Sequence, residues 1–113
     1  MQAKVEVSGA FRPLGDLIEG QLLRIGQEAV NNAVRHAEAR NVLINLKFDA
    51  KRVQLSVRDD GRGFVYQDTA DGGVKHFGLM GMRERAEQIG GTLTINSHAN
   101  EGTEVLVDVP ISG

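Results

Sequence analysis

The spacing of hydrophobic residues changes several times along this chain, and the order of the changes limits the possible folds. Residues 3–8 alternate between apolar and polar side chains, as in a strand. From about Asp16 to Ala37 the apolar residues recur at helical spacing. They are Leu22, Ile25, Ala29, Ala33 and Ala37, flanked by Leu23, Val30 and Val34. Residues 41–48 and 52–58 then alternate again, which predicts a hairpin of two strands.

The second half of the chain repeats this order after an interruption. Residues 65–77 show no periodicity, so we expect a mobile loop there. Residues 79–90 return to helical spacing and end at Gly90, and residues 92–97 and 103–110 alternate as a second hairpin. This order predicts one domain over residues 1–113. Its fold would be an α+β two-layer sandwich, with helices on one face of a mixed, mostly antiparallel sheet.

Composition excludes several classes of function. The formal net charge of -2 argues against a general binder of nucleic acid or of anionic membranes, so we expect neither nucleic-acid partners nor direct membrane contact. The chain has no cysteine, which excludes disulfides and thiolate metal sites. Its longest apolar runs are only a few residues, far short of the roughly 20 that span a bilayer.

The first predicted helix carries a row of polar side chains. Glu28, Asn32 and His36 follow one another at i, i+4 and i+8, and Arg35 is adjacent. Such a row can be a solvated helix face. A carboxylate, a carboxamide and an imidazole beside a stripe of small residues can also border a pocket, and asparagine is unfavourable inside a helix without a reason.

The second candidate is "VRDDGRGFVY" at residues 57–66, where a β-branched run ends in Asp59 and Asp60. Gly61 and Gly63 follow and allow a close approach of the backbone or a positive φ. Aspartate followed by glycine is ordinary turn chemistry. A carboxylate beside a backbone without side chains is equally a compact way to bind the exocyclic amine of adenine.

Two further stretches contain glycine at the start of an element. Gly78 and Gly81 precede or open the second predicted helix, where free N–H groups suit phosphate oxygens, although a loose helix start would look the same. The stretch has neither the Gly-Lys-Ser/Thr of a Walker loop nor the three spaced glycines of a dinucleotide fingerprint. Gly102 and Thr103 by themselves indicate only the end of a hairpin.

In this order and spacing, the four stretches resemble a known family. "E-x3-N-x2-RHA", "DDGRGF", "GLMGMRERA" and "GTEV" look like the N, G1, G2 and G3 boxes of the GHKL ATPases, which include DNA gyrase, heat-shock chaperones, histidine kinases and mismatch-repair ATPases. The chain most resembles the catalytic, ATP-binding domain of two-component sensor histidine kinases. Within these it is similar to the subfamily of the nitrate and nitrite sensors and the desaturase-regulating thermosensor.

The resemblance implies a site for ATP or ADP with Mg²⁺. Asp59 would accept a hydrogen bond from the adenine amine and share a water network with Thr103, while Gly61 and Gly63 leave room for the base. Residues 65–77 would be the ATP lid. The cofactor-binding positions after Gly63 would be Lys75 and His76 at the end of the lid, and Gly78, Leu79, Met80 and Gly81, whose amides would meet the β- and γ-phosphates.

The resemblance also implies a catalytic set on the first helix. Asn32 matches the family's Mg²⁺ ligand, and an amide oxygen suits this hard cation. Glu28 matches a general base of the hydrolytic relatives, and here it would polarise the nucleophile or orient Asn32. Arg35 and His36 match positions that approach the phosphates.

No phosphoacceptor histidine is visible. The family's acceptor is followed by an acidic residue, whereas His36, His76 and His98 are followed by alanine, phenylalanine and alanine. We therefore expect a fragment that cannot phosphorylate itself, the cytoplasmic part of a sensor anchored in the bacterial inner membrane. Its partners would be its own dimerisation and histidine-phosphotransfer domain and a response regulator.

Two other functions stay open at this stage. Free-standing GHKL serine kinases of the anti-sigma type are also small and lack a histidine helix. A non-catalytic nucleotide-binding scaffold could retain the four motifs as remnants.

Overall fold

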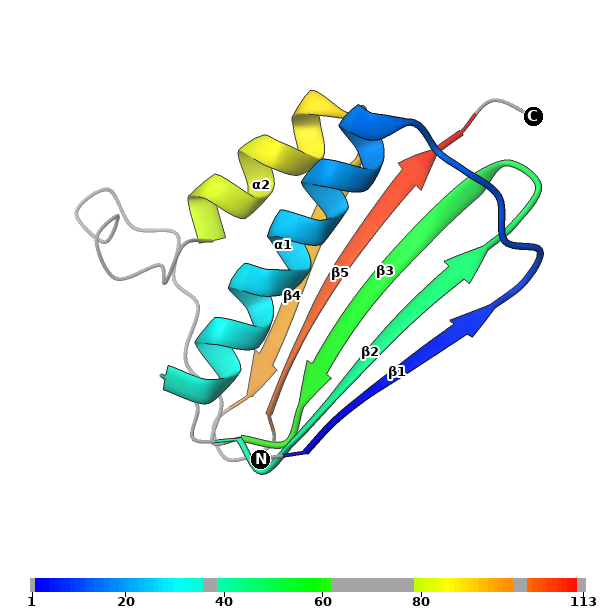
Figure 1. Cartoon of the computed structure of the whole chain (residues 1–113). Helices are drawn as coiled ribbons and strands as arrows, with labels where there is room; N and C mark the ends of the chain where they lie inside the picture. The colour runs from blue at the N-terminus through cyan, green and yellow to red at the C-terminus, as the bar shows by residue number, and fades with distance from the viewer. Residues whose placement is uncertain (1, 36–38, 62–78, 99–101, 112–113) are drawn as a thin grey trace.

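The computed structural model describes residues 2–35, 39–61, 79–98 and 102–111, and its elements follow the predicted order (Figure 1). They are β1 (Gln2–Ser8), α1 (Asp16–Arg35), β2 (Asn41–Phe48), β3 (Arg52–Asp59), α2 (Leu79–Gln88), β4 (Thr92–His98) and β5 (Gly102–Pro110). The predicted elements are therefore confirmed to within a few residues.

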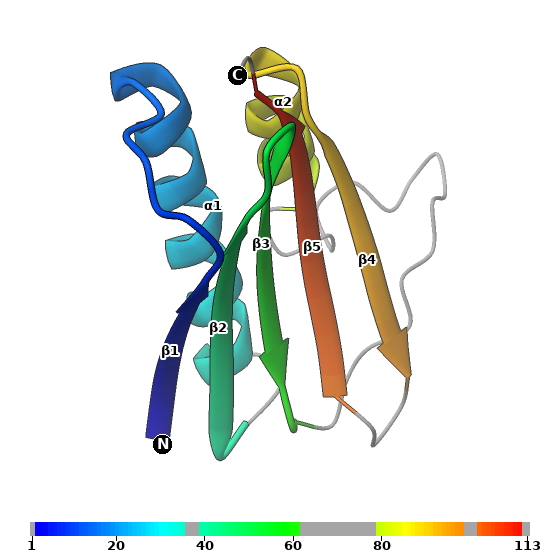
Figure 2. The same ribbon diagram turned by 90° about the vertical axis from the view of Figure 1, so that its right-hand side faces the viewer.

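The five strands form one sheet in the order β1-β2-β3-β5-β4. β1 runs parallel to β2, and the other three pairs are antiparallel. Both helices lie on the same face of this sheet (Figures 1 and 2). The predicted two-layer sandwich with a mixed, mostly antiparallel sheet is confirmed.

The core lies between the helices and the central strands. Its buried side chains come mainly from α1, α2, β3 and β5: Leu22, Ile25, Ala29, Ala33, Met82, Ala86, Ile89, Val53, Leu55, Val57, Val105, Val107 and Val109. The opposite face is polar, and ion pairs join Arg52 to Asp108 (2.9 Å) and Arg58 to Glu104 (3.7 Å) across β3 and β5. The two faces of β3 therefore differ clearly, and Val57 is on the core side.

The helix ends follow from local chemistry. Gly15, with a positive φ of 92°, accepts the N–H of Glu19 (3.0 Å), and the Glu19 carboxylate accepts the N–H of Leu14 (2.9 Å). The first bond closes the first turn of α1, and the second holds the Leu14 backbone against that turn. Gly90, with a φ of 75°, ends α2 in the left-handed conformation that suits glycine, as predicted.

One side of α1 is more open than its sequence pattern suggested. Leu23 and Val34 flank the predicted apolar stripe but are 62% and 50% exposed. β1 lies at the edge of the sheet, and its Val5 and Val7 are exposed (Figure 2). Neither described helix has the length and apolarity required to cross a membrane.

Candidate nucleotide-binding site

Asp59 lies at the end of β3, directly opposite Thr103 in the register of β3 and β5. Strand alternation places its side chain on the same face as Val57, toward the helices. Its Oδ1 accepts the N–H of Gly61 at 2.8 Å. Thr103 is 7% exposed and Gly61 is also buried. The structure therefore brings three predicted cofactor-binding residues together around one carboxylate.

The surroundings of Asp59 shift its pKa in opposing directions. Burial is the largest influence and raises the pKa of Asp59, while hydrogen bonds from the backbone of Gly61 and Thr103 lower it and the neighbouring charge of Asp60 raises it. The net effect is a pKa above its ordinary value. Because this carboxylate has lost part of its hydration, a donor from a ligand would meet less competition from water.

Asp60 connects the same corner of the sheet to β2. Its carboxylate accepts the N–H of Arg40 (2.9 Å), the N–H of Asn41 (2.8 Å) and the side-chain amide of Asn41 (2.8 Å). Hydrogen bonds from the backbone and side chain of Asn41 are the main reason that the pKa of Asp60 is lowered. Sequence reasoning gave Asn41 no role, because an asparagine at the start of a strand is not informative by itself.

The polar residues of α1 have different surroundings. Asn32 is only 7% exposed, between the core residues Ala29 and Ala33, so the solvated-face interpretation does not hold for it. Glu28 is half-buried, and Arg35, the last residue of α1, is exposed. Asn32 therefore offers a buried amide next to a more accessible carboxylate one turn earlier.

A polar groove of about 530 Å³ lies between α1 and α2. Two predicted residues, Glu28 and Gly81, line it together, and its other lining residues are Arg24, Gln27, Asn31, Met82 and Arg85. Arg24 and Arg85 were not predicted from the sequence as residues of this site. The i, i+4 spacing of Arg24 and Glu28, which places both on one side of α1, could have indicated Arg24. Arg85 donates to Gln21 (2.9 Å), which fixes the two helices side by side.

The start of α2 supplies backbone donors. α2 begins at Leu79, so the N–H groups of Leu79, Met80 and Gly81 fall in the first turn, which has no intrahelical acceptor for them. The side chain of Met80 is 61% exposed. Gly81 lies inside the helix, and within the described residues a Cβ there would meet nothing closer than 4 Å. The described neighbours of Gly81 would therefore leave room for a side chain at this position.

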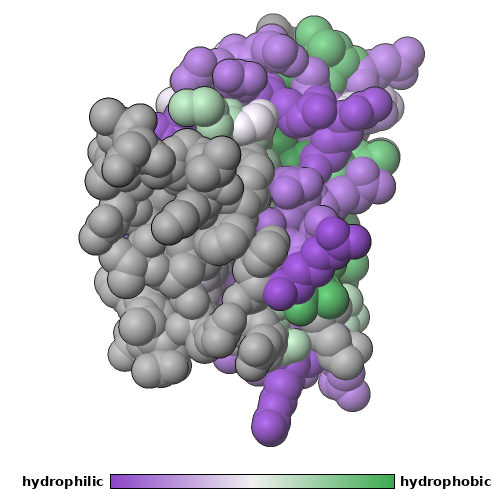
Figure 3. All heavy atoms as spheres, turned by 90° about the vertical axis from the view of Figure 1, so that its left-hand side faces the viewer, coloured by the Kyte–Doolittle hydropathy of each residue, from purple (hydrophilic) through white to green (hydrophobic). Residues whose placement is uncertain are grey.

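Several predicted residues cannot be placed. His36, Gly63, Lys75, His76 and Gly78, together with the predicted lid at 65–77, lie outside the described residues. Seen from the side on which α1 ends, the described side chains are mostly hydrophilic, with some hydrophobic ones between them (Figure 3). Among the described residues there is no group of three or more histidine or acidic side chains that could hold a metal ion.

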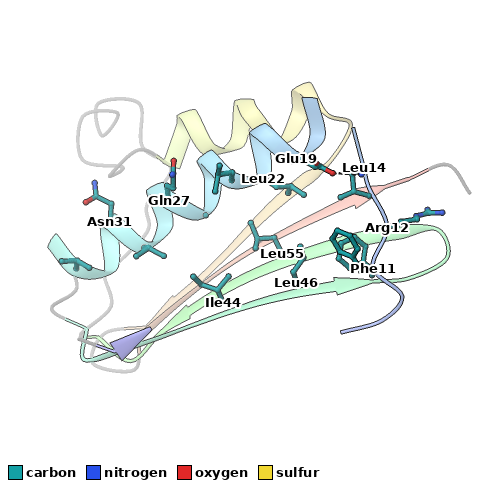
Figure 4. Close-up of a pocket in the computed structure, with 15 residues that line it drawn as sticks. Phe11, Arg12, Leu14, Glu19, Leu22, Gln27, Asn31, Ile44, Leu46 and Leu55 are labelled. Atoms are coloured by element: carbon teal, nitrogen blue, oxygen red, sulfur yellow. Dashed lines mark hydrogen bonds between the residues drawn. The ribbon is translucent and has the colours of Figure 1, made fainter. Parts of the chain in front are cut away.

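The largest hollow of the described part is a different one. It is an apolar groove of about 720 Å³ between α1 and the inner faces of β2 and β3, lined by Phe11, Leu22, Ile44, Leu46 and Leu55 among others (Figure 4). Phe11 packs edge to face on Phe48, with 5.3 Å between the ring centroids. None of the predicted site residues lines this groove. Its apolar walls offer phosphate oxygens little to bind.

Comparison with known proteins gives the same family as the motifs. The model of the histidine kinase-, DNA gyrase B- and HSP90-like ATPase family matches residues 18–113. The signal transduction histidine-protein kinase/phosphatase DegS of Bacillus subtilis is 36% identical over 99 residues, which are 88% of this chain and 26% of DegS. The oxygen sensor histidine kinase NreB of Staphylococcus carnosus is 39% identical over 95 residues, 84% of this chain and 27% of NreB. The chain thus spans about a quarter of the length of these curated relatives.

Solved structures share the fold. The histidine kinase domain of a blue-light activated kinase from Erythrobacter litoralis superposes with a TM-score of 0.71 at 23% identity, covering 96% of this chain and 55% of that one. The ATP-binding domain of PrrB from Mycobacterium tuberculosis superposes with a TM-score of 0.69 at 21% identity, covering 83% and 69%. The chain belongs to the family of histidine kinase-, DNA gyrase B- and HSP90-like ATPases, as an ATP-binding catalytic domain of the two-component sensor histidine kinase type.

Proposed function

We propose that this domain binds ATP with Mg²⁺ and donates the γ-phosphoryl group to a histidine on a separate dimerisation domain. The observation that carries the proposal is the position of Asp59. Its carboxylate lies opposite the buried Thr103 and is oriented by the N–H of Gly61 at 2.8 Å. A fixed, partly desolvated acceptor is what recognition of an exocyclic amine requires.

The adenine base would lie against this corner of the sheet. Asp59 would accept from the 6-amino group, and Thr103 would share a water with the base and with Asp59. Gly61 and Gly63 would let the ring approach the backbone without a side chain in the way. This assignment would give a partner to a carboxyl whose pKa is raised by burial.

The phosphates would lie between α1 and the start of α2. The N–H groups of residues 78–81 would bind the β- and γ-phosphates, and the charges of Arg35, His36, Lys75 and His76 would neutralise them. Phosphoryl transfer requires mainly such positioning and neutralisation. Glu28 would polarise the accepting histidine or orient Asn32, and the polar groove that it lines with Gly81 supports its placement near the phosphates.

Mg²⁺ would be held by the Oδ1 of Asn32 together with phosphate oxygens and waters. A single neutral amide oxygen fits this cation, which prefers octahedral oxygen coordination and usually keeps several waters. The bound cation would supply charge neutralisation for the triphosphate. The burial of Asn32 supports this role, because a buried amide holds its direction better than an exposed one.

Replacing Asn32 with alanine is expected to remove most of the Mg²⁺ contribution to nucleotide binding. For the unchanged protein, Mg-ADP at a hundred times its dissociation constant should stabilise the fold by about 2.7 kcal/mol, which corresponds to a rise in melting temperature of roughly 10 °C. In Asn32→Ala, ADP with Mg²⁺ should raise the melting temperature no more than ADP with EDTA. If Mg-ADP did not raise the melting temperature of the unchanged protein, the result would support the non-catalytic scaffold instead.

Transfer to histidine can be tested with a purified dimerisation domain from a sensor kinase such as NreB, added to this domain with labelled ATP. Acid-labile label on the histidine of that partner is the expected result. Acid-stable phosphoserine on a partner would support the anti-sigma type of kinase instead. The relatives are sensor histidine kinases, which favours the first outcome.

We further propose that the complete protein works with a response regulator. The matched relatives are of the two-component type, and a phosphohistidine needs an acceptor downstream. The domain would lie in the cytoplasm, where ATP and the regulator are available, as part of a sensor anchored in the bacterial inner membrane.

A further inference from the structure

We propose that Asp60 is a positioning residue which, together with Asn41, holds the Asp59 carboxylate in the direction that selects an adenine base. This inference rests on the proposed role of Asp59 in nucleotide binding. It concerns a second carboxylate, adjacent to the first in sequence, that makes its hydrogen bonds within the protein rather than toward a ligand.

The hydrogen bonds of Asp60 hold it firmly. Its Oδ1 accepts the N–H groups of both Arg40 and Asn41, and its Oδ2 accepts the side-chain amide of Asn41, all at 2.8–2.9 Å. In return, the N–H of Asp60 donates to the carbonyl of Asn41 at 3.2 Å. The two residues therefore exchange bonds in both directions, across 19 positions of sequence.

These hydrogen bonds lie just beyond the end of the pairing between β2 and β3. Val42, near the start of β2, and Asp59, at the end of β3, form the terminal pair of these two strands. Beyond them the backbone turns, and the N–H of Gly61 must return toward Asp59 Oδ1. Asp60 is the single residue between Asp59 and Gly61, so its anchoring to the start of β2 fixes the turn that orients the Asp59 carboxylate.

The energetic contribution of this cluster to folding need not be large. Asp60 is exposed, and water competes for its hydrogen bonds. The direction of its pKa, lowered mainly by Asn41, agrees with bonds to the charged form. A carboxylate that holds the turn in place can thus affect ligand selection more than stability.

The test measures selection between bases. Inosine diphosphate carries an oxygen where ADP carries the 6-amino donor, so the ratio of ADP to IDP affinity reports how well the Asp59 carboxylate is aimed. By isothermal titration, Asp60→Ala should lower this ratio about tenfold, as for a lost charged hydrogen bond, with little change in melting temperature. Asp49→Ala is the matched control: Asp49 accepts the N–H of Lys51 at 3.2 Å in the turn at the other end of the same strands.

A side-chain exchange separates positioning from a merely structural role. In Asp60→Asn the new amide nitrogen faces the amide nitrogen of Asn41, and two donors meet. Combining Asp60→Asn with Asn41→Asp restores a donor and an acceptor in that place, so the double variant should regain the selection ratio to within about threefold. Should Asp60→Ala fail to fold, Asn41→Ala, which removes one bond only, is expected to lower the ratio by a smaller factor.

Each result has one meaning. A ratio lost in both Asp59→Asn and Asp60→Ala, and regained in the exchanged pair, supports the inference. A ratio lost in Asp59→Asn but kept in Asp60→Ala, or not regained in the exchanged pair, overturns the inference and leaves the proposed function standing. A ratio kept in Asp59→Asn overturns the role of Asp59, and the inference with it. Equal weakening of ADP and IDP by Asp60→Ala indicates structural damage and overturns it too.

Discussion

Asp59→Asn is expected to weaken ADP binding by about 10- to 100-fold, the effect of losing a hydrogen bond to a charged group at a partly desolvated site. The substitution keeps the shape of the side chain, and the asparagine oxygen can still accept the N–H of Gly61. The amide nitrogen that replaces the other carboxylate oxygen is a donor, however, and it would face the amino donor of the adenine. Isothermal titration of the variant with ADP measures the loss.

The pH dependence of binding gives a second measure of the same residue. Adenine recognition needs the ionised form of Asp59, and burial raises its pKa above the ordinary value. As the pH falls through this raised pKa, the carboxylate takes up a proton, loses its charge and becomes a weaker acceptor with an O–H donor of its own. ADP affinity should therefore begin to fall at a higher pH than for an unshifted aspartate, and Asp59→Asn should lack this component.

The same substitution should not destabilise the protein without nucleotide. A folded-state pKa above the unfolded value means that the ionised aspartate costs folding free energy at neutral pH, a cost that disappears as the pH falls through the raised pKa. Asparagine has no such charge, so the variant should melt at or above the temperature of the unchanged protein at pH 7. Asp49→Asn, at the opposite end of the strands, should leave ADP affinity unchanged. Unchanged ADP affinity in Asp59→Asn would remove the adenine assignment.

Periodicity predicted the elements because they bury one continuous face. The stripe of Leu22, Ile25, Ala29 and Ala33 is buried as the spacing indicated, and α1 continues through Gly20 although glycine favours helix least after proline. Tertiary packing outweighs that local cost, since α1 buries these four side chains in the core.

Periodicity could not define the edges of that face. Leu23 and Val34 continue the apolar pattern but are exposed. The spacing shows which residues share a side of the helix, but it does not show which parts of that side another element covers. The hydrogen bonds between Asp60 and Asn41 could not be predicted from the sequence for a related reason. They join residues 19 apart that meet only when β2 and β3 pair in register, and no local pattern specifies that meeting.

The register of β5 brings a glycine against the adenine-reading end of β3. Gly102 has a φ of 91°, and a Cβ at this position would overlap the carbonyl oxygen of Asp59 and approach the Cα of Asp60 to 3.3 Å. A flexible side chain could move away from such a contact, but these are backbone atoms of the turn. Glycine is thus required at position 102 for two reasons: its backbone adopts a positive φ, and a side chain there would displace the backbone of Asp59 and Asp60.

Gly102→Ala is therefore expected to damage stability and binding together. The backbone conformation alone should lower the free energy of unfolding by about 1–3 kcal/mol. The displaced Asp59 should in addition weaken ADP binding by at least about tenfold, as for a misaligned charged hydrogen bond. Urea unfolding and isothermal titration measure the two effects separately.

Gly20→Ala is the matched control, because it changes the same atoms in a place that accepts them. Gly20 lies inside α1, and within the described residues a Cβ there would meet nothing closer than 4 Å. This variant should be up to about 1 kcal/mol more stable than the unchanged protein, from helix propensity, and should bind ADP normally. If Gly102→Ala bound ADP as tightly as Gly20→Ala, the start of β5 would have no part in holding Asp59, and the carboxylate would owe its direction to the turn of Gly61 and the anchor of Asp60 alone.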